Sequence, residues 1–146
     1  MKNGVLYIQI NEKLFKISVK SVEIGVYSEV TKNFCNKFTI KITNLKTKVS
    51  KYFVFYDSHY NYTQGKTTLD VSDLARAASC IMDDALQGNQ SFEEFTSEIW
   101  PPTNEEDYQN AKRAYKACIT TLNKLKQLGL DIEEIENLYN QFINIW

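Results

Sequence analysis

The sequence is poor in the residues and patterns that mark several classes of protein. Its 146 residues include two prolines, five glycines and one histidine. So little proline and glycine argues against a disordered or low-complexity chain. No apolar run approaches the length of a membrane span, and no apolar leader segment follows Met1. We therefore expect a globular protein of the cytoplasm with no membrane association.

Cysteine is also scarce, with Cys35, Cys80 and Cys118 odd in number and far apart in the chain. None belongs to a Cys-x-x-Cys pair, and His59 is the only histidine that could join them in binding a metal. A disulfide framework and a zinc site both lack ligands, so we predict a reducing compartment, no metal and no cofactor. Cys80 and Cys118 lie on or beside apolar helix stripes, and we interpret them as buried small hydrophobic residues.

Basic residues are missing from one long stretch. Residues 1–69 hold eleven lysines against four acidic residues, a net charge of +7, whereas residues 70–146 hold six basic and fourteen acidic residues, a net charge of −8. From Ala77 to Ala111 there is no lysine or arginine, while eight acidic residues fall inside: Asp83, Asp84, Glu93, Glu94, Glu98, Glu105, Glu106 and Asp107. We predict a basic lobe over 1–69 and an acidic lobe over 70–146, packed as one compact unit.

The basic lobe has the alternation of an antiparallel sheet. Apolar Phe38, Ile40 and Ile42 alternate with polar residues, including Lys41, as in a sheet with one face in water. β-Branched and aromatic runs separated by short polar connections predict about five strands. The expected ranges are 5–10, 14–19, 21–30, 38–42 and 51–56.

The acidic lobe changes to a helical period, which makes the chain an α+β protein. Four helices are expected, over 71–87, from Ser91 to before Pro101, over 103–128, and from 132 onward. Capping boxes pair Ser91 with Glu94, Thr103 with Glu106 and Asp131 with Glu134. Gly88 is predicted to supply the left-handed residue after the first of these helices, and Gly129 is predicted to end the third. The last two helices should form an antiparallel hairpin.

Two short patterns suggest catalysis, and neither is complete. Gly65-Lys66-Thr67-Thr68 resembles the end of a phosphate-binding loop, but Tyr60 stands where the loop needs its first glycine. Asp57, Ser58 and His59 are neighbours in sequence, and such neighbours at a strand end rarely converge on one point. An enzyme built around Asp57, His59 and Lys66 is therefore the least favoured hypothesis, and we predict that the protein is not an enzyme.

The lysines and aromatic residues of the basic lobe suggest nucleic-acid binding as an alternative function. A sheet that displays both can neutralise phosphates and stack bases. However, alternate aromatic residues on a strand mostly face a core, and the usual RNA-reading sheet signature is absent. The candidate residues for this alternative are Lys41, Lys46, Lys48, Lys51, Tyr52 and Lys66.

The acidic stretch has an ordinary explanation for half of its members. Glu93, Glu94, Glu105 and Glu106 are first-turn helix residues, where the helix dipole favours a negative charge. The helix dipole does not explain why the stretch from Ala77 to Ala111 contains no lysine or arginine. An uncompensated acidic surface can attract a basic groove, such as the nucleic-acid channel of another protein. The opposite charges of the two lobes also favour self-association, so the chain is a monomer or a dimer.

Scattered positions over residues 50–120 resemble a family of small uncharacterised proteins from bacteriophages and mobile elements. The resemblance rests on Phe55-Tyr56-Asp57-Ser58, Gly65-Lys66, Asp73-Leu74, Cys80-Ile81, Asp84-Ala85, Gly88, Ser91-Phe92-Glu93-Glu94-Phe95 and Ala111-x-x-x-Tyr115-Lys116-Ala117-Cys118. The chain departs from the family at Ile99-Trp100-Pro101-Pro102, where the family tends to have a Gly-Tyr-Asp turn and a shorter link.

The resemblance implies a function in a bacterial host. Small phage proteins without catalytic motifs are often inhibitors of host machinery or defence, anti-CRISPR proteins among them. Together with the acidic stretch, this predicts an inhibitory binding protein that docks on a host complex, such as a CRISPR effector nuclease. The alternative is a nucleic-acid-binding accessory protein of a mobile element.

Overall fold

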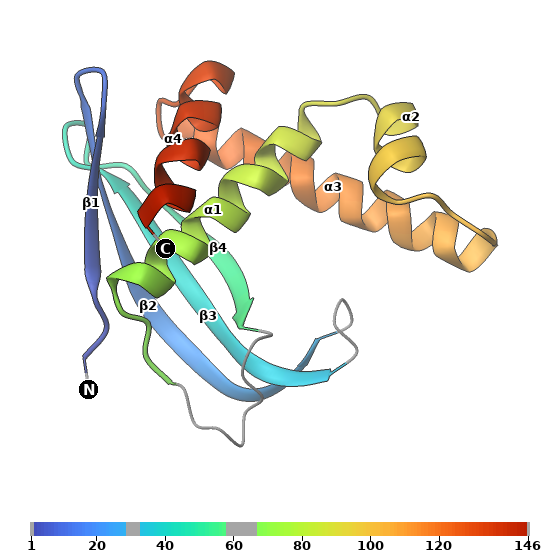
Figure 1. The fold of residues 1–146 in the computed structure, drawn as a ribbon, viewed down its shortest axis with the longest axis horizontal. Helices are drawn as coiled ribbons and strands as arrows, with labels where there is room; N and C mark the ends of the chain where they lie inside the picture. The colour runs from blue at the N-terminus through green and yellow to red at the C-terminus, as the bar shows by residue number, and fades with distance from the viewer. Residues whose placement is uncertain (1, 29–32, 58–66, 146) are drawn as a thin grey trace.

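The basic lobe forms one antiparallel sheet in the computed structural model, which describes residues 2–28, 33–57 and 67–145. Each strand pairs with the next along the chain, in the order β1-β2-β3-β4 (Figure 1). The strands are β1 (Val5–Ile10), β2 (Lys13–Ser28), β3 (Asn33–Asn44) and β4 (Ser50–Asp57). The α+β class and the antiparallel sheet predicted from the sequence are confirmed.

The prediction of about five strands is wrong by one, because two of the expected strands are parts of β2. The register of β2 against β3 shifts twice, between Val19 and Ser21 and again between Glu23 and Val26. Such bulges bend a strand without ending it. Gly25 lies in the second bulge with φ 69°, and its amide donates to Asn36 Oδ1 at 3.2 Å. The break expected at Lys20, between the predicted strands 14–19 and 21–30, is therefore a bend within β2.

The acidic lobe is helical and follows the sheet. Its elements are α1 (Val71–Gly88), α2 (Phe92–Glu94), the π-helix η2 (Phe95–Ile99), α3 (Glu105–Gln127) and α4 (Ile132–Ile145). None of the helices in the described ranges is long and apolar enough to cross a bilayer.

Side-chain caps start these helices largely where the sequence predicts. The capping boxes at Ser91 and Asp131 are both present. At α3 the cap is Asn104, whose Oδ1 accepts from the Asp107 amide at 2.7 Å. The prediction that Thr103 is the cap is therefore wrong by one residue.

The two glycines at helix ends behave differently. α3 ends before Gly129, as predicted, and Gly129 has the left-handed φ of 97°. Gly88 is still part of α1 and is buried, so the prediction of a left-handed residue there is wrong. A Cβ at Gly88 would lie 2.6 Å from both the carbonyl carbon and the oxygen of Cys118. Gly88 is needed for the close approach of two helices, and not for a turn.

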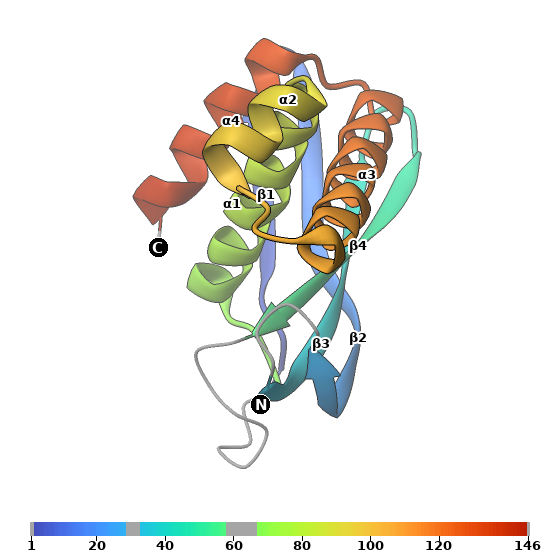
Figure 2. The same ribbon diagram turned by 90° about the vertical axis from the view of Figure 1, so that its right-hand side faces the viewer.

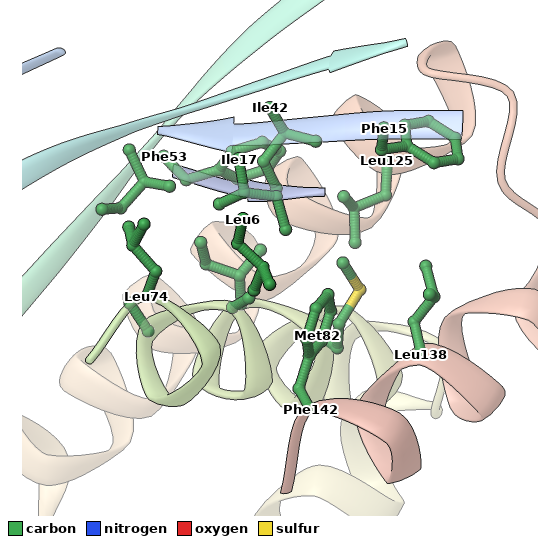
Figure 3. Packing of buried hydrophobic residues seen from close by; sticks show 14 of the residues in the cluster. Leu6, Phe15, Ile17, Ile42, Phe53, Leu74, Met82, Leu125, Leu138 and Phe142 are labelled. Atoms are coloured by element: carbon green, nitrogen blue, oxygen red, sulfur yellow. The ribbon is translucent and has the colours of Figure 1, made fainter. Parts of the chain in front are cut away.

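The core lies between the inner face of the sheet and α1, as Figure 3 shows. Strand residues such as Phe15, Ile17 and Ile42 meet Leu74 and Met82 of α1. Leu125 of α3 and Leu138 and Phe142 of α4 complete the same cluster. Residues of both predicted lobes thus share this core cluster.

α1 lies between α3 and α4 (Figure 2), and each of these packs against α1. The predicted antiparallel hairpin of the last two helices is therefore wrong. The reason is the composition of α1. Its buried residues include Ala75, Ala77, Ala78 and Ala85, and such small side chains let helices approach on two sides.

Candidate binding surfaces

The predicted acidic residues are spread along the side of the molecule that α2 occupies. α2 lies along α3 at the end of the molecule farthest from β1 (Figure 1). A second apolar cluster joins them, with Phe95, Ala111 and Cys118 at its centre. Asp83 and Asp84 belong to α1, Glu93 and Glu94 to α2, and Glu105, Glu106 and Asp107 to the first turn of α3. The side chain of Glu98 lies outside the described part of the structure.

Some of these carboxylates hold the local structure. Glu94 accepts from the amide and hydroxyl of Ser91 in the capping box of α2. Asp107 accepts from Trp100 Nε1 and from the Thr103 amide, both at 3.0 Å. These bonds, the one from Trp100 above all, lower the pKa of Asp107. Glu94 and Asp107 therefore have structural partners that account for their presence.

α3 also carries basic side chains, and α2 packs against this part of the helix. The Phe92 ring contacts the rings of Tyr108 and Tyr115 of α3. Between and after these tyrosines, α3 exposes Lys112, Arg113 and Lys116. Basic residues therefore follow the acidic stretch within the helix that α2 contacts.

Asp84 has the most perturbed carboxyl group of the eight. It is exposed, but it lies close to α3, and the partial loss of water together with the Asp83 charge raises its pKa to about 6. Burial, then the Asp84 and Asp83 charges, raise the pKa of the Cys118 thiol to about 12. Cys118 is buried as predicted, whereas Cys80 is exposed, so the prediction of a buried Cys80 is wrong. Cys80 points outward because it lies off the stripe of α1 that meets the core.

The outer face of the sheet, turned away from the helices, carries a different set of residues. Phe15, Ile17, Ile40 and Ile42 are buried toward the helices. Side chains alternate along a strand, so the residues between these four point the other way. Lys16 lies opposite Thr43 on this outer face, and Ser18, Lys41 and Tyr52 form one row across β2, β3 and β4.

Four lysines form a zigzag line along the two middle strands of this face. In order along the sheet they are Lys16, Lys41, Lys20 and Lys37, alternating between β2 and β3. Each is about two residues further along than the last, which is a step of about 7 Å. Lys20 Nζ lies 4.3 Å from the centre of the Tyr52 ring, which places both side chains on the same face. We call this set the lysine line.

Aromatic rings flank the lysine line on both sides. Tyr7 of β1 is opposite Lys16 and is 57% exposed, and Tyr52 of β4 is opposite Lys41 and is 40% exposed. Among the described positions of the outer face, one is acidic. This is Glu23, whose carboxylate lies 3.9 Å from Lys37 Nζ. The face is therefore basic and aromatic, with a single negative charge at one end.

The structure brings together part of the set predicted from the sequence. Lys41 and Tyr52 are direct neighbours across the strands. Lys46 and Lys48 lie on the turn between β3 and β4, and Lys51 at the start of β4 falls on the inner side of the alternation. Lys66 lies outside the described residues. Lys16, Lys20, Lys37 and Tyr7 were not selected from the sequence. The alternation of residues 14–19 could have identified Lys16, because its two neighbours in the chain face the core.

The residues that suggested catalysis are only partly described. Ser58, His59 and Lys66 lie outside the described ranges. Asp57 is buried and accepts from Arg76 Nη2 at 3.3 Å, and the Arg76 guanidinium lies 5.1 Å from the centre of the Phe55 ring. This ion pair ties the end of β4 to α1. Within the described ranges, no three His, Cys, Asp or Glu side chains are grouped to hold a metal ion.

A cleft of about 840 Å³ lies where three turns meet, and the buried Glu134 is one of its lining residues. Glu134 accepts from Lys13 Nζ and from Asn11 Nδ2, both at 2.7 Å, and from the Asp131 amide at 3.1 Å. Burial alone would raise the pKa of Glu134, but these bonds and the Lys13 charge outweigh it and lower the pKa. The cleft is thus bridged by bonds that join the start of α4 to the β1–β2 turn.

No family model, curated protein or solved structure matches this chain. The resemblance to small phage proteins stays a prediction.

Proposed function

We propose that this protein acts by binding nucleic acid through the outer face of its sheet. The observation that carries the proposal is the lysine line with its two flanking tyrosines. Lysines neutralise backbone phosphates, and the release of their counterions supplies much of the affinity of such complexes. Four evenly spaced cations beside a single carboxylate are an arrangement that suits a polyanion.

Most positions of the lysine line have no ion pair within the described part of the chain, which also supports nucleic-acid binding. Lys16, Lys20 and Lys41 form no ion pair with the described residues, so binding a phosphate would not break one. Lys13, by contrast, donates to Glu134 and to the Gly129 carbonyl and is committed to the fold. Lys37 is paired with Glu23, and Lys20 contacts the Tyr52 ring, whereas no ion pair with the described residues accounts for Lys16 and Lys41.

The test compares two double variants in a fluorescence anisotropy titration with a labelled 16-nucleotide strand at low salt. Lys16→Gln/Lys41→Gln removes half of the lysine line and should weaken binding by about ten-fold or more, because each lysine contributes a phosphate contact. Lys116→Gln/Lys126→Gln removes the same charge from exposed positions on α3 and should bind like the wild type. Equal losses in both variants would show that net charge, and not this face, drives binding.

A second candidate function is inhibition of a host complex through the acidic side. It is favoured by Asp84, Glu93 and Glu106, which are exposed and whose carboxylates have no hydrogen bond or ion pair to the described residues. This version corresponds to a phage inhibitor of anti-CRISPR type acting on a basic nucleic-acid channel. Copurification of a nuclease effector from the bacterial host by both the wild type and Lys16→Gln/Lys41→Gln would favour it over the sheet.

A further inference from the structure

We infer that the partner of the outer face is a single strand of nucleic acid, whose bases stack on Tyr7 and Tyr52. This inference rests on the proposed function and narrows its ligand. Tyr7 is 57% exposed and Tyr52 is 40% exposed, and both lie on the outer face. An exposed aromatic ring offers a base a stacking surface, and a base can use it only when it is free of a duplex.

The positions of the four central residues define a path across the sheet. Tyr7 lies beside Lys16 on neighbouring strands, and Lys41 lies beside Tyr52 one row further along. From the spacing of strands and residues, the two tyrosines are about 15 Å apart, with both lysines between them. A strand that crosses the sheet from β1 to β4 would thus meet a ring, two cations and a second ring.

Lys20 strengthens the site at its β4 end. Its ammonium lies 4.3 Å from the centre of the Tyr52 ring, on the outer face of the sheet. A cation at this distance is attracted by one face of the ring, so a base that stacks on Tyr52 would use the other face and have this positive charge beside it. Ring and cation are therefore held together before a ligand arrives.

Charge complementarity selects this occupant over an apolar one. The outer face also exposes Val5 and Val54, but these are separated by the lysine line. An apolar partner would have to bury Lys16, Lys20 and Lys41 without counter-charges, which is costly. A polyanion leaves no such charge unpaired.

The test uses three double variants of the full chain that differ only in what they remove from this face. Tyr7→Thr/Tyr52→Thr removes both rings and keeps residues that favour strands. Val5→Thr/Val54→Thr removes apolar area of the same face and leaves the rings. Tyr7→Phe/Tyr52→Phe keeps the stacking surface without the hydroxyl groups. Circular dichroism and thermal unfolding establish that each variant is folded.

Anisotropy titrations would be run with a single strand, a duplex of the same length and inorganic polyphosphate. We expect tighter binding to the single strand than to the duplex. Tyr7→Thr/Tyr52→Thr should lose about ten-fold or more of the single-strand affinity, in line with the measured contribution of base stacking, and should keep its affinity for polyphosphate. The valine and phenylalanine variants should bind the single strand like the wild type.

Three results would overturn the inference. Equal affinity for single strand and duplex, unchanged in Tyr7→Thr/Tyr52→Thr, would refute stacking and leave the proposed function standing. Absence of binding to all three polyanions would refute both. Concentration-dependent self-association in sedimentation experiments, abolished by Lys16→Gln/Lys41→Gln, would identify the acidic side of a second copy as the occupant.

Discussion

Replacement of Gly88 by alanine has two opposite effects on stability. It raises the helix propensity of α1, and it introduces a steric overlap where α1 contacts α3. In an isolated helix, Gly→Ala is stabilising by about 1 kcal/mol, because alanine loses less backbone freedom on folding. In this fold the new Cβ would lie 2.6 Å from the Cys118 carbonyl carbon and oxygen and 2.8 Å from the Ile119 amide nitrogen. All three are backbone atoms, so no side-chain rotation can relieve the overlap.

The magnitude follows from how far the helices must separate. An ordinary contact of a Cβ begins at 3.4 Å, so α1 and α3 must move apart by about 0.8 Å near Gly88. A gap of this size loses a quarter to a half of the dispersion energy of the atoms that line it. Overpacking costs about 1–3 kcal/mol, and we take the upper half of this range, about 2–3 kcal/mol, because the overlap is with backbone atoms; this exceeds the gain of about 1 kcal/mol in helix propensity. We expect Gly88→Ala to lower the free energy of unfolding by about 1–2 kcal/mol.

Urea denaturation followed by circular dichroism measures this change. Asn89→Ala serves as the control, since Asn89 is exposed and adjacent to Gly88, and it should change the free energy of unfolding by less than about 0.5 kcal/mol. A Gly88→Ala protein as stable as the wild type, or more stable, would show that helix propensity decides and that the close helix contact is not as described.

Two further predictions concern buried or crowded carboxylates. Glu134→Gln should lower the free energy of unfolding at pH 7 by about 1–3 kcal/mol in thermal or urea unfolding, because the charge partner of Lys13 is lost. Since the pKa of Glu134 is lowered by folding, its contribution is present above its unfolded pKa and is lost as the pH falls through the folded value, so Glu134→Gln should flatten the loss of stability in acid. Asp84 has the opposite sign, because folding raises its pKa to about 6, and its ionised form is disfavoured in the folded state as the pH rises from 4 to 6. Asp84→Asn should therefore be slightly more stable than the wild type at pH 7, by less than about 1 kcal/mol after allowance for solvent screening, and equally stable at pH 4; a loss of stability at pH 7 would contradict this.

Local signals in the sequence located most of the elements. The capping boxes at Ser91 and Asp131 and the left-handed Gly129 depend on residues within one turn of a helix end, so their effect can be predicted from neighbours in the chain. The alternation around Ile40 and Ile42 correctly predicted a sheet with one open face. In each of these cases the interaction lies within a few residues.

The errors concern contacts between distant segments. Gly88 has the sequence context of a helix stop, but its role is set by Cys118, thirty residues away. The hairpin of the last two helices was expected from the short turn at Gly129. Instead, α3 and α4 each pack against α1, where small alanine side chains allow a close approach. The lysine line spans two strands, and its continuity depends on the bulge at Lys20, which the sequence presented as a connection.

The salt dependence of binding tests the central claim most directly. For a single strand, the slope of log affinity against log salt concentration is about −0.7 for each phosphate neutralised. Contacts with Lys16, Lys41 and Lys20 predict a slope of about −2.1 for the wild type, and Lys20 alone predicts about −0.7 for Lys16→Gln/Lys41→Gln. The Lys116→Gln/Lys126→Gln control should keep the wild-type slope. A wild-type slope near zero would contradict the assignment of nucleic-acid binding to this face. So would a control variant whose slope is reduced as much as that of Lys16→Gln/Lys41→Gln.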